Sequence, residues 1–189
     1  MYKIILASSS KNRKTLLQNI NIPFEVDFPI CNEESIQDTS ALILTQKRAR
    51  AKAESLIEKY QAQNVILIGC DTVIECGGVV FGKPKNCNEV KAMFLDYEGK
   101  SHKVHSSICC INAFTLQSEL ATSTSSVFFS NFEANELDDY IKSGEWKEVS
   151  GGYRLQGLAS RFIKKIEGSP SGIIGLPIHE LFSLLKKIT

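Results

Sequence analysis

The chain has 189 residues, of which 43% are hydrophobic, and its 22 Lys and Arg nearly balance its 21 Asp and Glu, leaving a formal charge of +1. A chain of this length buries roughly 70% of its unfolded surface, so it can form a core without disulfides or structural metals. The near-zero charge disfavours a protein that holds a nucleic-acid backbone, so a phosphate partner must be bound by local cations.

No feature of the sequence directs the chain to a membrane or to an oxidising compartment. No apolar run approaches the ~18 residues that span a bilayer, and the first residues lack a signal-peptide pattern. The six cysteines form neither a CxxC pair nor a zinc-ligand spacing. We therefore expect a cytoplasmic protein with reduced thiols, in which Cys70 fills apolar space rather than acting as a reactive group. Without repeats or linkers, residues 1–189 are expected to form one domain.

The first predicted elements are a strand and a helix joined by three serines. Lys3–Ala7 has the pattern of a short buried strand, and one of Ser8–Ser10 can cap the helix that follows. Cations in a first helical turn oppose the helix dipole unless an anion is bound nearby; here they are Lys11, Arg13 and Lys14. The segment fits an anion-binding site, or equally a capped surface helix with solvated cations.

An acidic loop and a basic helix come next. Glu33 and Glu34 lie in the loop, and nothing local distinguishes them. The alanine-rich stretch Ser40–Tyr60 predicts one long helix, on which Arg48 and Lys52 share a face because they are four residues apart. Either cation could reach into a cleft, although a solvated basic face is the default for such a helix.

The segment Ile68–Pro84 (IGCDTVIECGGVVFGKP) organises our interpretation. Asp71 follows a buried strand, which is where open α/β sheets expose their ligand crevice. Gly77-Gly78 then predicts a tight hairpin, and its return arm ends at Lys83. We interpret the carboxylate and the cation as groups that serve a metal ion and a polyphosphate. The alternative is an ordinary hairpin with a turn aspartate and a solvated lysine.

The remaining pattern predicts further strands and helices. Predicted strands are Ile22–Phe28 at a sheet edge, 104–114 and 125–132; predicted helices follow Asn86 or Asn88, Asn135 and Pro177. His102 and His105 share no spacing with a carboxylate ligand set, so we expect surface histidines. Gln156 lies in a glycine-rich loop, where its amide could bind the edge of a base or face water.

Three blocks of the sequence, taken in order, resemble the Maf family of nucleotide pyrophosphatases. They are LASSSKNR (Leu6–Arg13), Ile68–Pro84 and GYRLQGLASRFIKKIEGSPSGIIGLP (Gly152–Pro177). The resemblance implies an α/β fold with a mixed central sheet, flanking helices and two lobes around a deep nucleotide-binding cleft, as in inosine triphosphatases. It also implies hydrolysis of a nucleoside triphosphate to the monophosphate and pyrophosphate with Mg²⁺ or Mn²⁺.

The resemblance also assigns roles to residues. It implies that Asp71 is the catalytic acidic residue, that Glu33 is its acidic partner, and that both hold the metal. Lys52 matches the lysine that the family's long helix sends into the site, which leaves Arg48 as a bystander. The positions that match the family's phosphate-binding residues are Ser8, Arg13 and Lys83.

Base preference follows less directly from the resemblance. Thr72 and Gln156 match positions of the branch that acts on dTTP and UTP rather than the branch that acts on methylated GTP. Two departures leave the base open, modified nucleotides included: Asn12 replaces a specificity-linked arginine, and Val149 replaces a lysine. They also motivate an alternative, a nucleotide-binding regulator without turnover. The expected partner is a nucleoside triphosphate, not a nucleic acid or a membrane; a homodimer is left open.

The same residues fit the chemistry on their own. Phosphoryl transfer needs fixed cations for the charge that develops on oxygen, and Arg13, Lys52 and Lys83 can supply them. Glu33 with Asp71 can bind a divalent cation through oxygen while Asp71 orients or deprotonates the attacking water. The sequence has no GxSxG elbow, Walker loop or HExxH motif, so a covalent nucleophile is not expected.

Overall fold

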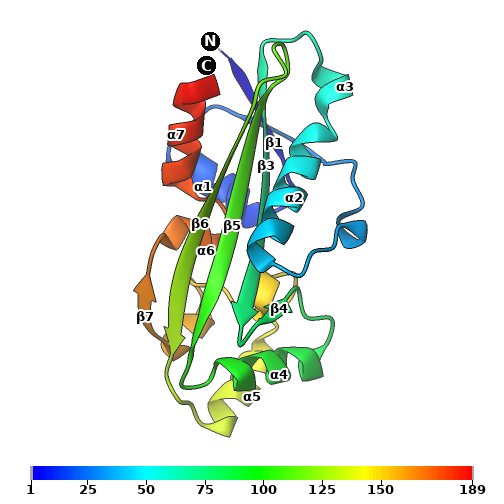
Figure 1. Cartoon of the computed structure of the whole chain (residues 1–189). Coiled ribbons are helices and arrows are strands. Elements are labelled where there is room, and N and C mark those ends of the chain that lie inside the picture. Colours follow the sequence, from blue (N-terminus) through cyan, green and yellow to red (C-terminus); the bar gives the residue numbers. More distant parts are fainter. Residues whose placement is uncertain (1, 189) are drawn as a thin grey trace. The chain divides into compact units, whose positions relative to one another are not determined.

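The structure is a computed structural model that describes residues 2–188, and it has a mixed α/β architecture (Figure 1). The sheet of the described residues has seven strands. They are β1 (Lys3–Ala7), β2 (Glu25–Asp27), β3 (Val65–Cys76), β4 (Val79–Phe81), β5 (Ser101–Asn112), β6 (Ser118–Phe129) and β7 (Ile163–Glu167). Their order is β2-β1-β3-β5-β6-β7, with β4 pairing with β3. Parallel β1–β2 and β1–β3 pairs and antiparallel β3–β4 and β6–β7 pairs confirm the predicted mixed sheet.

Helices flank the strands. The α-helices are α1 (Lys11–Asn19), α2 (Ala41–Glu54), α3 (Ile57–Tyr60), α4 (Cys87–Tyr97), α5 (Ala134–Ser143), α6 (Pro170–Ile174) and α7 (Ile178–Ile188). Three short 3-10 helices are η1 (Glu33–Ser35), η2 (Ser150–Gly152) and η3 (Leu158–Phe162). Across the described residues, none of the helices is long and apolar enough to cross a membrane.

The chain divides into two compact units. The first comprises the described residues up to Asp71, Ser106–Ser123 and those from Gly175 onward; the second comprises Thr72–His105 and Thr124–Ile174. Strands β3, β5 and β6 contribute residues to both units. That the chain unfolds as a single domain stays a prediction of the sequence.

The core of the first unit has a layer on each face of its strands. Alternate residues of β1 and β3 point to opposite faces, as strand geometry requires. Leu6, Ile66 and Ile68 pack with α1 and α7, whereas Ile5 and Leu67 pack with α2. Figure 1 accordingly shows α2 and α7 on opposite sides of the strands. Odd-numbered side chains of β3 in this unit therefore face α2.

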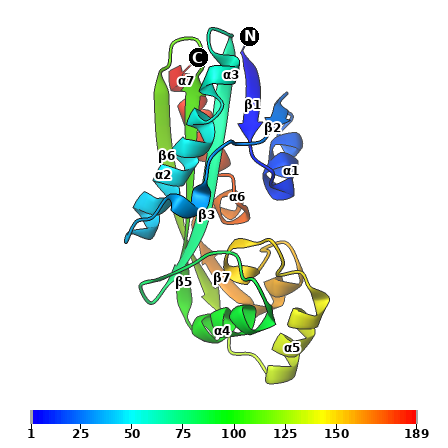
Figure 2. The same cartoon turned by 90° about the vertical axis from the view of Figure 1, so that its right-hand side faces the viewer.

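The core of the second unit is an aromatic cluster. Phe94 of α4 packs against Tyr140 of α5 with ring centroids 4.9 Å apart, and α4 and α5 lie side by side (Figure 2). The buried members of this cluster include Tyr97, Phe129, Tyr153 and Phe162.

The two histidines predicted at the surface are buried, so that prediction was wrong. His102 is 2% exposed, and its Nε2 lies 2.8 Å from the Tyr153 hydroxyl. His105 is 5% exposed, with Nδ1 and Nε2 each 3.0 Å from an oxygen, of Thr124 and Glu75 respectively. Each imidazole is buried with a hydrogen-bonding partner on a neighbouring segment, which reduces the cost of burying a polar ring. Burial lowers the pKa of His102 to about 4, so this side chain is neutral at pH 7.

The predicted long helix Ser40–Tyr60 is divided into α2 and α3. Ser40 caps α2 as expected, by accepting from the Ile43 amide. The helix ends at Glu54, and the Ser55 hydroxyl at its C-cap donates to the Lys52 carbonyl at 2.8 Å. Two other predictions were also inexact: Glu133, not Asn135, caps α5, and the polar turn after Gly168 contains α6.

The hairpin was predicted correctly, but the position of Asp71 was not. Gly77 and Gly78 have φ angles of 58° and 80°, which supply the turn between β3 and β4. Asp71 does not follow a strand; it lies inside β3, which continues to Cys76. The parallel neighbour β1 does end there, since its last residue, Ala7, pairs with Gly69. Asp71 is therefore two residues beyond the end of the parallel β1–β3 pair.

Helix α2 makes a close backbone contact with β3 at Gly69. A Cβ placed on Gly69 would lie 2.1 Å from the Ala49 carbonyl oxygen and 2.6 Å from the Ala53 amide nitrogen. No side chain fits between these backbones, so a glycine is required by space rather than by its φ angle. Lys52 shares this face of α2 because it is one turn from Ala49, and Asp71 shares the face of β3 that Gly69 presents. The contact therefore brings the lysine to the carboxylate.

We expect Gly69→Ala to lower the free energy of unfolding by about 1–3 kcal/mol, because the added methyl group must push two backbones apart. Urea denaturation measures this loss. The control is Gly82→Ala, where a Cβ meets no atom within 4 Å, and its expected change is within about 0.5 kcal/mol. Equal losses in the two variants would contradict the packing argument.

We expect His102 to make the protein less stable in acid. Its pKa of about 4 in the folded chain is below the ~6.5 of an unfolded chain, so the unfolded state binds more protons between these values. The free energy of unfolding should therefore fall as the pH drops from about 6.5 to about 4, by up to ~1.4 kcal/mol per pH unit.

Urea denaturation across this pH range tests the effect by comparing the wild type with His102→Gln. The variant should lose this part of the pH dependence. The control variant His179→Gln, at an exposed position, should retain it. A slope for His102→Gln that matches the wild type would refute the assignment.

Candidate functional site

The centre of the candidate site is one lysine held by two carboxylates. Lys52 Nζ lies 2.8 Å from Asp71 Oδ1 and 2.7 Å from Glu33 Oε2. It also donates to the Cys70 carbonyl at 3.2 Å. The Lys52 and Asp71 side chains are only 5% and 8% exposed, whereas that of Glu33 is 44% exposed. The three groups come from α2, β3 and η1, and all belong to the first unit.

Local structure explains which of the alternative residues reach this cluster. Glu33 begins η1, whose first turn is fixed by Asn32, and it contacts Lys52, whereas Glu34 is exposed. Lys52 lies on the helix face that meets β3, while the Arg48 guanidinium donates to the Ile36 carbonyl. The structure therefore distinguishes the two acids and the two cations that the pattern alone left equivalent.

Asp71 has one oxygen bound and one without a hydrogen-bonding partner. Oδ2 is buried and accepts no hydrogen bond from any residue between 2 and 188. A buried carboxylate oxygen without a partner is costly, so such an atom indicates a place for a water, a metal ion or a ligand. Asp71 Oδ2 is therefore available to bind a water, a metal ion or a substrate.

The carboxylates suit a divalent cation only as part of a larger coordination shell. Among residues 2–188, no three His, Cys, Asp or Glu side chains gather into a cluster that could hold a metal by themselves. Mg²⁺ is usually bound through one or two carboxylates, with waters and substrate phosphates completing the shell. Glu33 and the open oxygen of Asp71 fit that limited role.

A second group of predicted residues lies where β1 leads into α1. The Ser8 hydroxyl accepts from the Ser10 amide at 3.2 Å and from an Arg13 guanidinium nitrogen, also at 3.2 Å. Arg13 Nε donates to the Gly175 carbonyl at 2.9 Å, and the Ser10 side chain caps α1. The serine loop, the arginine and the segment before α7 are thus tied together in the first unit.

Cys70 is a structural residue. Burial raises the pKa of its thiol to about 11, although the nearby cations Arg13 and Lys52 lower it. The thiol is therefore protonated at pH 7, and its side chain packs in the core with Leu6 and Ile68. The expectation of a small apolar filler is confirmed over the reactive alternative.

The other predicted site residues are placed as follows. Asn12 is half-buried in the first turn of α1. Lys83, Thr72 and Gln156 belong to the second unit. Lys83 is exposed and lies 3.3 Å from Glu148 Oε2, Thr72 is half-buried in β3, and Gln156 is exposed in a turn. Their roles in catalysis or binding stay predictions.

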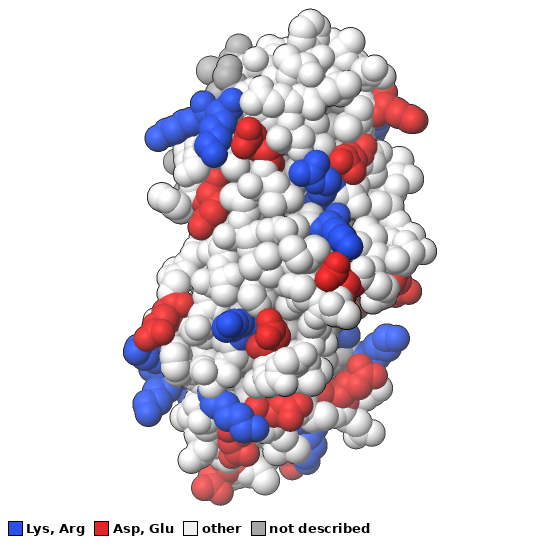
Figure 3. Space-filling view, in the orientation of Figure 1, with Lys and Arg blue, Asp and Glu red and all other residues white. Residues whose placement is uncertain are grey.

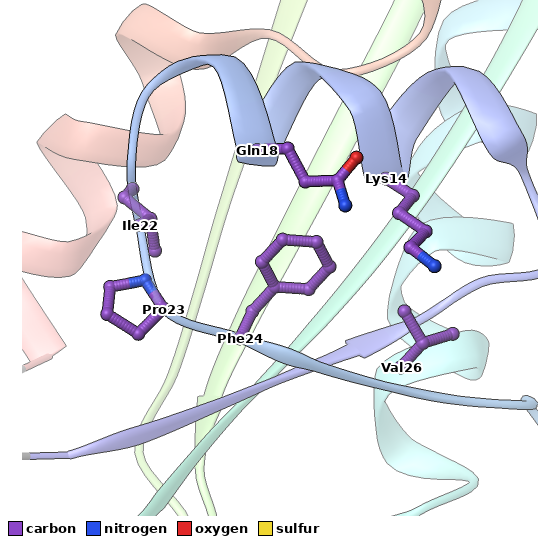
Figure 4. A pocket seen from close by; sticks show the side chains of 6 residues that line it. All are labelled: Lys14, Gln18, Ile22, Pro23, Phe24 and Val26. Carbon is purple, nitrogen blue, oxygen red and sulfur yellow. The ribbon is translucent and has the colours of Figure 1, made fainter.

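Neither the surface charge nor a hollow beside α1 offers a better site. Blue and red side chains are interspersed over the face shown in Figure 3, as the near-neutral composition predicts. A shallow hollow of about 430 Å³ lies between α1 and the segment that leads into β2 (Figure 4). Its walls contain no carboxylate and no predicted site residue: they are Lys14, Gln18, Ile22, Pro23, Phe24 and Val26.

Reasoning from the sequence missed two residues that position the first unit's groups. Gly69 leaves room for α2 to pack against β3, and the Gly175 carbonyl accepts a hydrogen bond that orients Arg13. A signal for Gly69 was present, since a glycine inside an apolar strand often marks close backbone approach. No comparable signal exists for a carbonyl more than 160 residues away from its partner.

Comparison with known proteins identifies the family. The model of the Maf-like protein family matches residues 3–188. The chain belongs to the Maf family. A relative from Treponema denticola named dTTP/UTP pyrophosphatase is 36% identical, with 99% of this chain and 97% of the relative aligned. Relatives of the same name from Hydrogenovibrio crunogenus and Desulforamulus reducens are 36% and 35% identical and cover 98% of the chain and 95% and 96% of their own lengths.

Among solved structures, a HAM1 protein from Coxiella burnetii is similar with a TM-score of 0.49 and 12% identity, covering 99% of this chain and all of that chain. This distant likeness transfers no function.

We expect Lys52→Met to lower the free energy of unfolding by about 3–5 kcal/mol at pH 7, because Asp71 would be left buried and unpaired. The double variant Lys52→Met/Asp71→Asn should recover part of this loss, since it removes the unpaired charge. Urea denaturation of both variants measures the difference.

The matched control is Lys59→Met, which removes an exposed lysine from its pair with Asp27. Its expected loss is below about 1 kcal/mol. A double variant as unstable as Lys52→Met alone would show that the charge on Asp71 is not the cause.

Proposed function

We propose that this chain hydrolyses a nucleoside triphosphate, with dTTP or UTP preferred, to the nucleoside monophosphate and pyrophosphate. The observation that carries the proposal is the buried lysine held by two carboxylates, one with an open oxygen. Membership of the Maf family and the names of the relatives support the substrate class. On this proposal the chain is a hydrolase of acid anhydrides.

Asp71 acts as the general base of the reaction. Its Oδ1 is fixed by Lys52, which leaves Oδ2 to orient a water and accept its proton as the water attacks phosphorus. The fixed ammonium keeps the carboxylate in one orientation. Lys52 also offsets part of the negative charge of the two acids before an anionic substrate arrives.

A divalent cation bound by Glu33 and Asp71 would supply Lewis-acid stabilisation of the phosphate oxygens. The oxygen donors and their small number fit Mg²⁺ or Mn²⁺, which the family resemblance also implies. The chain's own contribution is to hold the two carboxylates on one ammonium, so that they are ordered before the cation binds.

Cations bind the triphosphate. Arg13, held by Ser8 and Gly175, offers a guanidinium at the amino end of α1, a position that favours anions. The Ser8 hydroxyl is a further donor to phosphate oxygen. Lys83 is proposed as another phosphate ligand, which requires it to leave its exposed pair with Glu148. Such a pair is weak enough to be exchanged at little cost.

Base selection is proposed to involve Thr72 and Gln156, whose hydroxyl and amide offer donors and acceptors to a pyrimidine edge. Asn12 stands where the family has an arginine, so a neutral amide replaces a charge near the phosphate-binding loop. We expect this change to alter the choice of base more than the site of cleavage.

The products distinguish the proposal from its alternatives. Purified protein is incubated with dTTP, UTP and the other common triphosphates in the presence of Mg²⁺ or Mn²⁺, and phosphorus NMR follows the products. We expect pyrophosphate and the nucleoside monophosphate. Release of orthophosphate and a diphosphate would contradict the proposal. A nucleotide that binds and stays intact for hours would favour the regulator without turnover.

We expect Asp71→Asn to reduce turnover by roughly a hundredfold or more while the protein remains folded, because the amide cannot accept the proton. The readout is the initial rate of pyrophosphate release, with circular dichroism to confirm folding. Asp138→Asn is the control, because Asp138 forms an exposed pair with Lys91 in the second unit. Full activity in Asp71→Asn would disprove the assignment of the general base.

A further inference from the structure

The turn that carries Gln156 is anchored on its amino side by two aromatic hydroxyls. The Tyr153 side chain is 4% exposed, and its hydroxyl lies 2.8 Å from His102 Nε2. The Tyr140 hydroxyl donates to the Gly152 carbonyl at 2.9 Å. The turn itself is closed by the Gly157 amide, which donates to the Arg154 carbonyl at 3.2 Å. Gln156 is exposed, but the backbone before it is fixed to the core of the second unit.

On the carboxyl side, the anchor is the carboxylate of Glu145. Glu145 Oε2 accepts from the Leu158 amide at 2.9 Å, and Oε1 accepts from the Ala159 amide at 3.3 Å. These are the first two amides of η3, whose N-cap position is occupied by Gly157 without any capping side chain. Glu145 therefore supplies the cap from a distant part of the sequence, and bonds from amides to a charged acceptor are the stronger kind.

Gly157 provides the room for this carboxylate. A Cβ at position 157 would lie 2.4 Å from Glu145 Oε1 and 2.5 Å from Oε2. The φ and ψ angles of Gly157 are −112° and −158°, so extended backbone rather than a left-handed conformation is present. The carboxylate lies against the Cα of Gly157, so a Cβ at this position would displace it from the two amides. Glu145 and Gly157 thus form one contact, which ends one residue after Gln156.

We propose that Glu145 is a positioning residue for base selection, acting through the backbone of Gln156. This inference rests on the proposed function. A primary amide has a donor side and an acceptor side, so its match to a base edge depends on where the backbone holds it. Anchors on both sides of the turn order it before the substrate binds, which reduces the entropy lost on binding. Within residues 2–188, Glu145 is the charged side chain that accepts hydrogen bonds from the amides of residues 158 and 159.

The test compares two bases in matched variants. UTP and CTP differ only at C4 and N3 of the ring, so the ratio of their kcat/KM values reports base recognition and not phosphate handling. Glu145→Ala and Gly157→Ala each break the same contact, the first by removing the carboxylate and the second by displacing it. We expect each to reduce the wild-type preference about tenfold, which corresponds to ~1.4 kcal/mol.

Two further variants show whether the effect passes through Gln156. The double variant Glu145→Ala/Gly157→Ala should lose no more preference than either single variant, because one contact is lost in all three. Gln156→Ala should lose the preference between UTP and CTP. The double variant Gln156→Ala/Glu145→Ala should show the same preference as Gln156→Ala alone. Glu145→Gln keeps one carbonyl acceptor and should recover part of the preference. The losses should appear mainly in KM for the preferred base.

Glu133→Ala is the control for a merely structural role. Glu133 also caps a helix, α5, and its side chain accepts no hydrogen bond from the 153–159 turn. It should lower the melting temperature while leaving the preference unchanged. The inference is overturned if Glu145→Ala lowers only the melting temperature, or if Glu133→Ala changes the preference as much.

The outcome for the wild type separates this inference from the proposed function. If the wild type releases no pyrophosphate from any nucleotide, the proposed function fails, and the inference that rests on it fails too. If the wild type is active and Gln156→Ala changes the preference while Glu145→Ala and Gly157→Ala do not, only the positioning role is refuted.

Discussion

The ammonium of Lys52 is the interaction on which the candidate site depends. Two carboxylates from separate elements would repel each other and resist burial if this cation were absent. With Lys52 between them, Asp71 is held in one orientation inside a strand, and Glu33 is held in a loop. The interaction in turn needs α2 to lie directly on β3, which is possible only because Gly69 has no side chain. The ion pairs of Lys52 therefore depend on the close packing of α2 against β3.

The sequence predicted those turns and helix starts that depend on neighbouring residues alone. The β3–β4 turn followed from two consecutive glycines, and the starts of α1 and α2 followed from serines that accept from helix amides. The mixed sheet and the grouping of Glu33, Lys52 and Asp71 were anticipated through the resemblance to the Maf family. The residues alone could not separate Glu33 from Glu34, because the difference arises from a helix that lies elsewhere in the sequence.

The errors come from long-range contacts. His102 and His105 look like surface residues in a polar stretch, yet each finds an oxygen from another segment and is buried with it. Asp71 looks like the residue after a strand, but β3 continues beyond the end of β1, where β4 pairs with Ile74–Cys76. The contact of the Glu145 carboxylate with Gly157 and η3 has no local sequence signal either, since eleven residues lie between positions 145 and 157.

The contact at Gly69 also limits how this sequence can change over evolutionary time. The atoms nearest to a Cβ at this position are the Ala49 carbonyl oxygen and the Ala53 amide nitrogen, both of them backbone. Shrinking a neighbouring side chain therefore cannot make room, so no second substitution on α2 compensates for a larger residue. Homologues that keep this helix-on-strand geometry should keep glycine here regardless of their base preference, and a mutational library should hold the position constant.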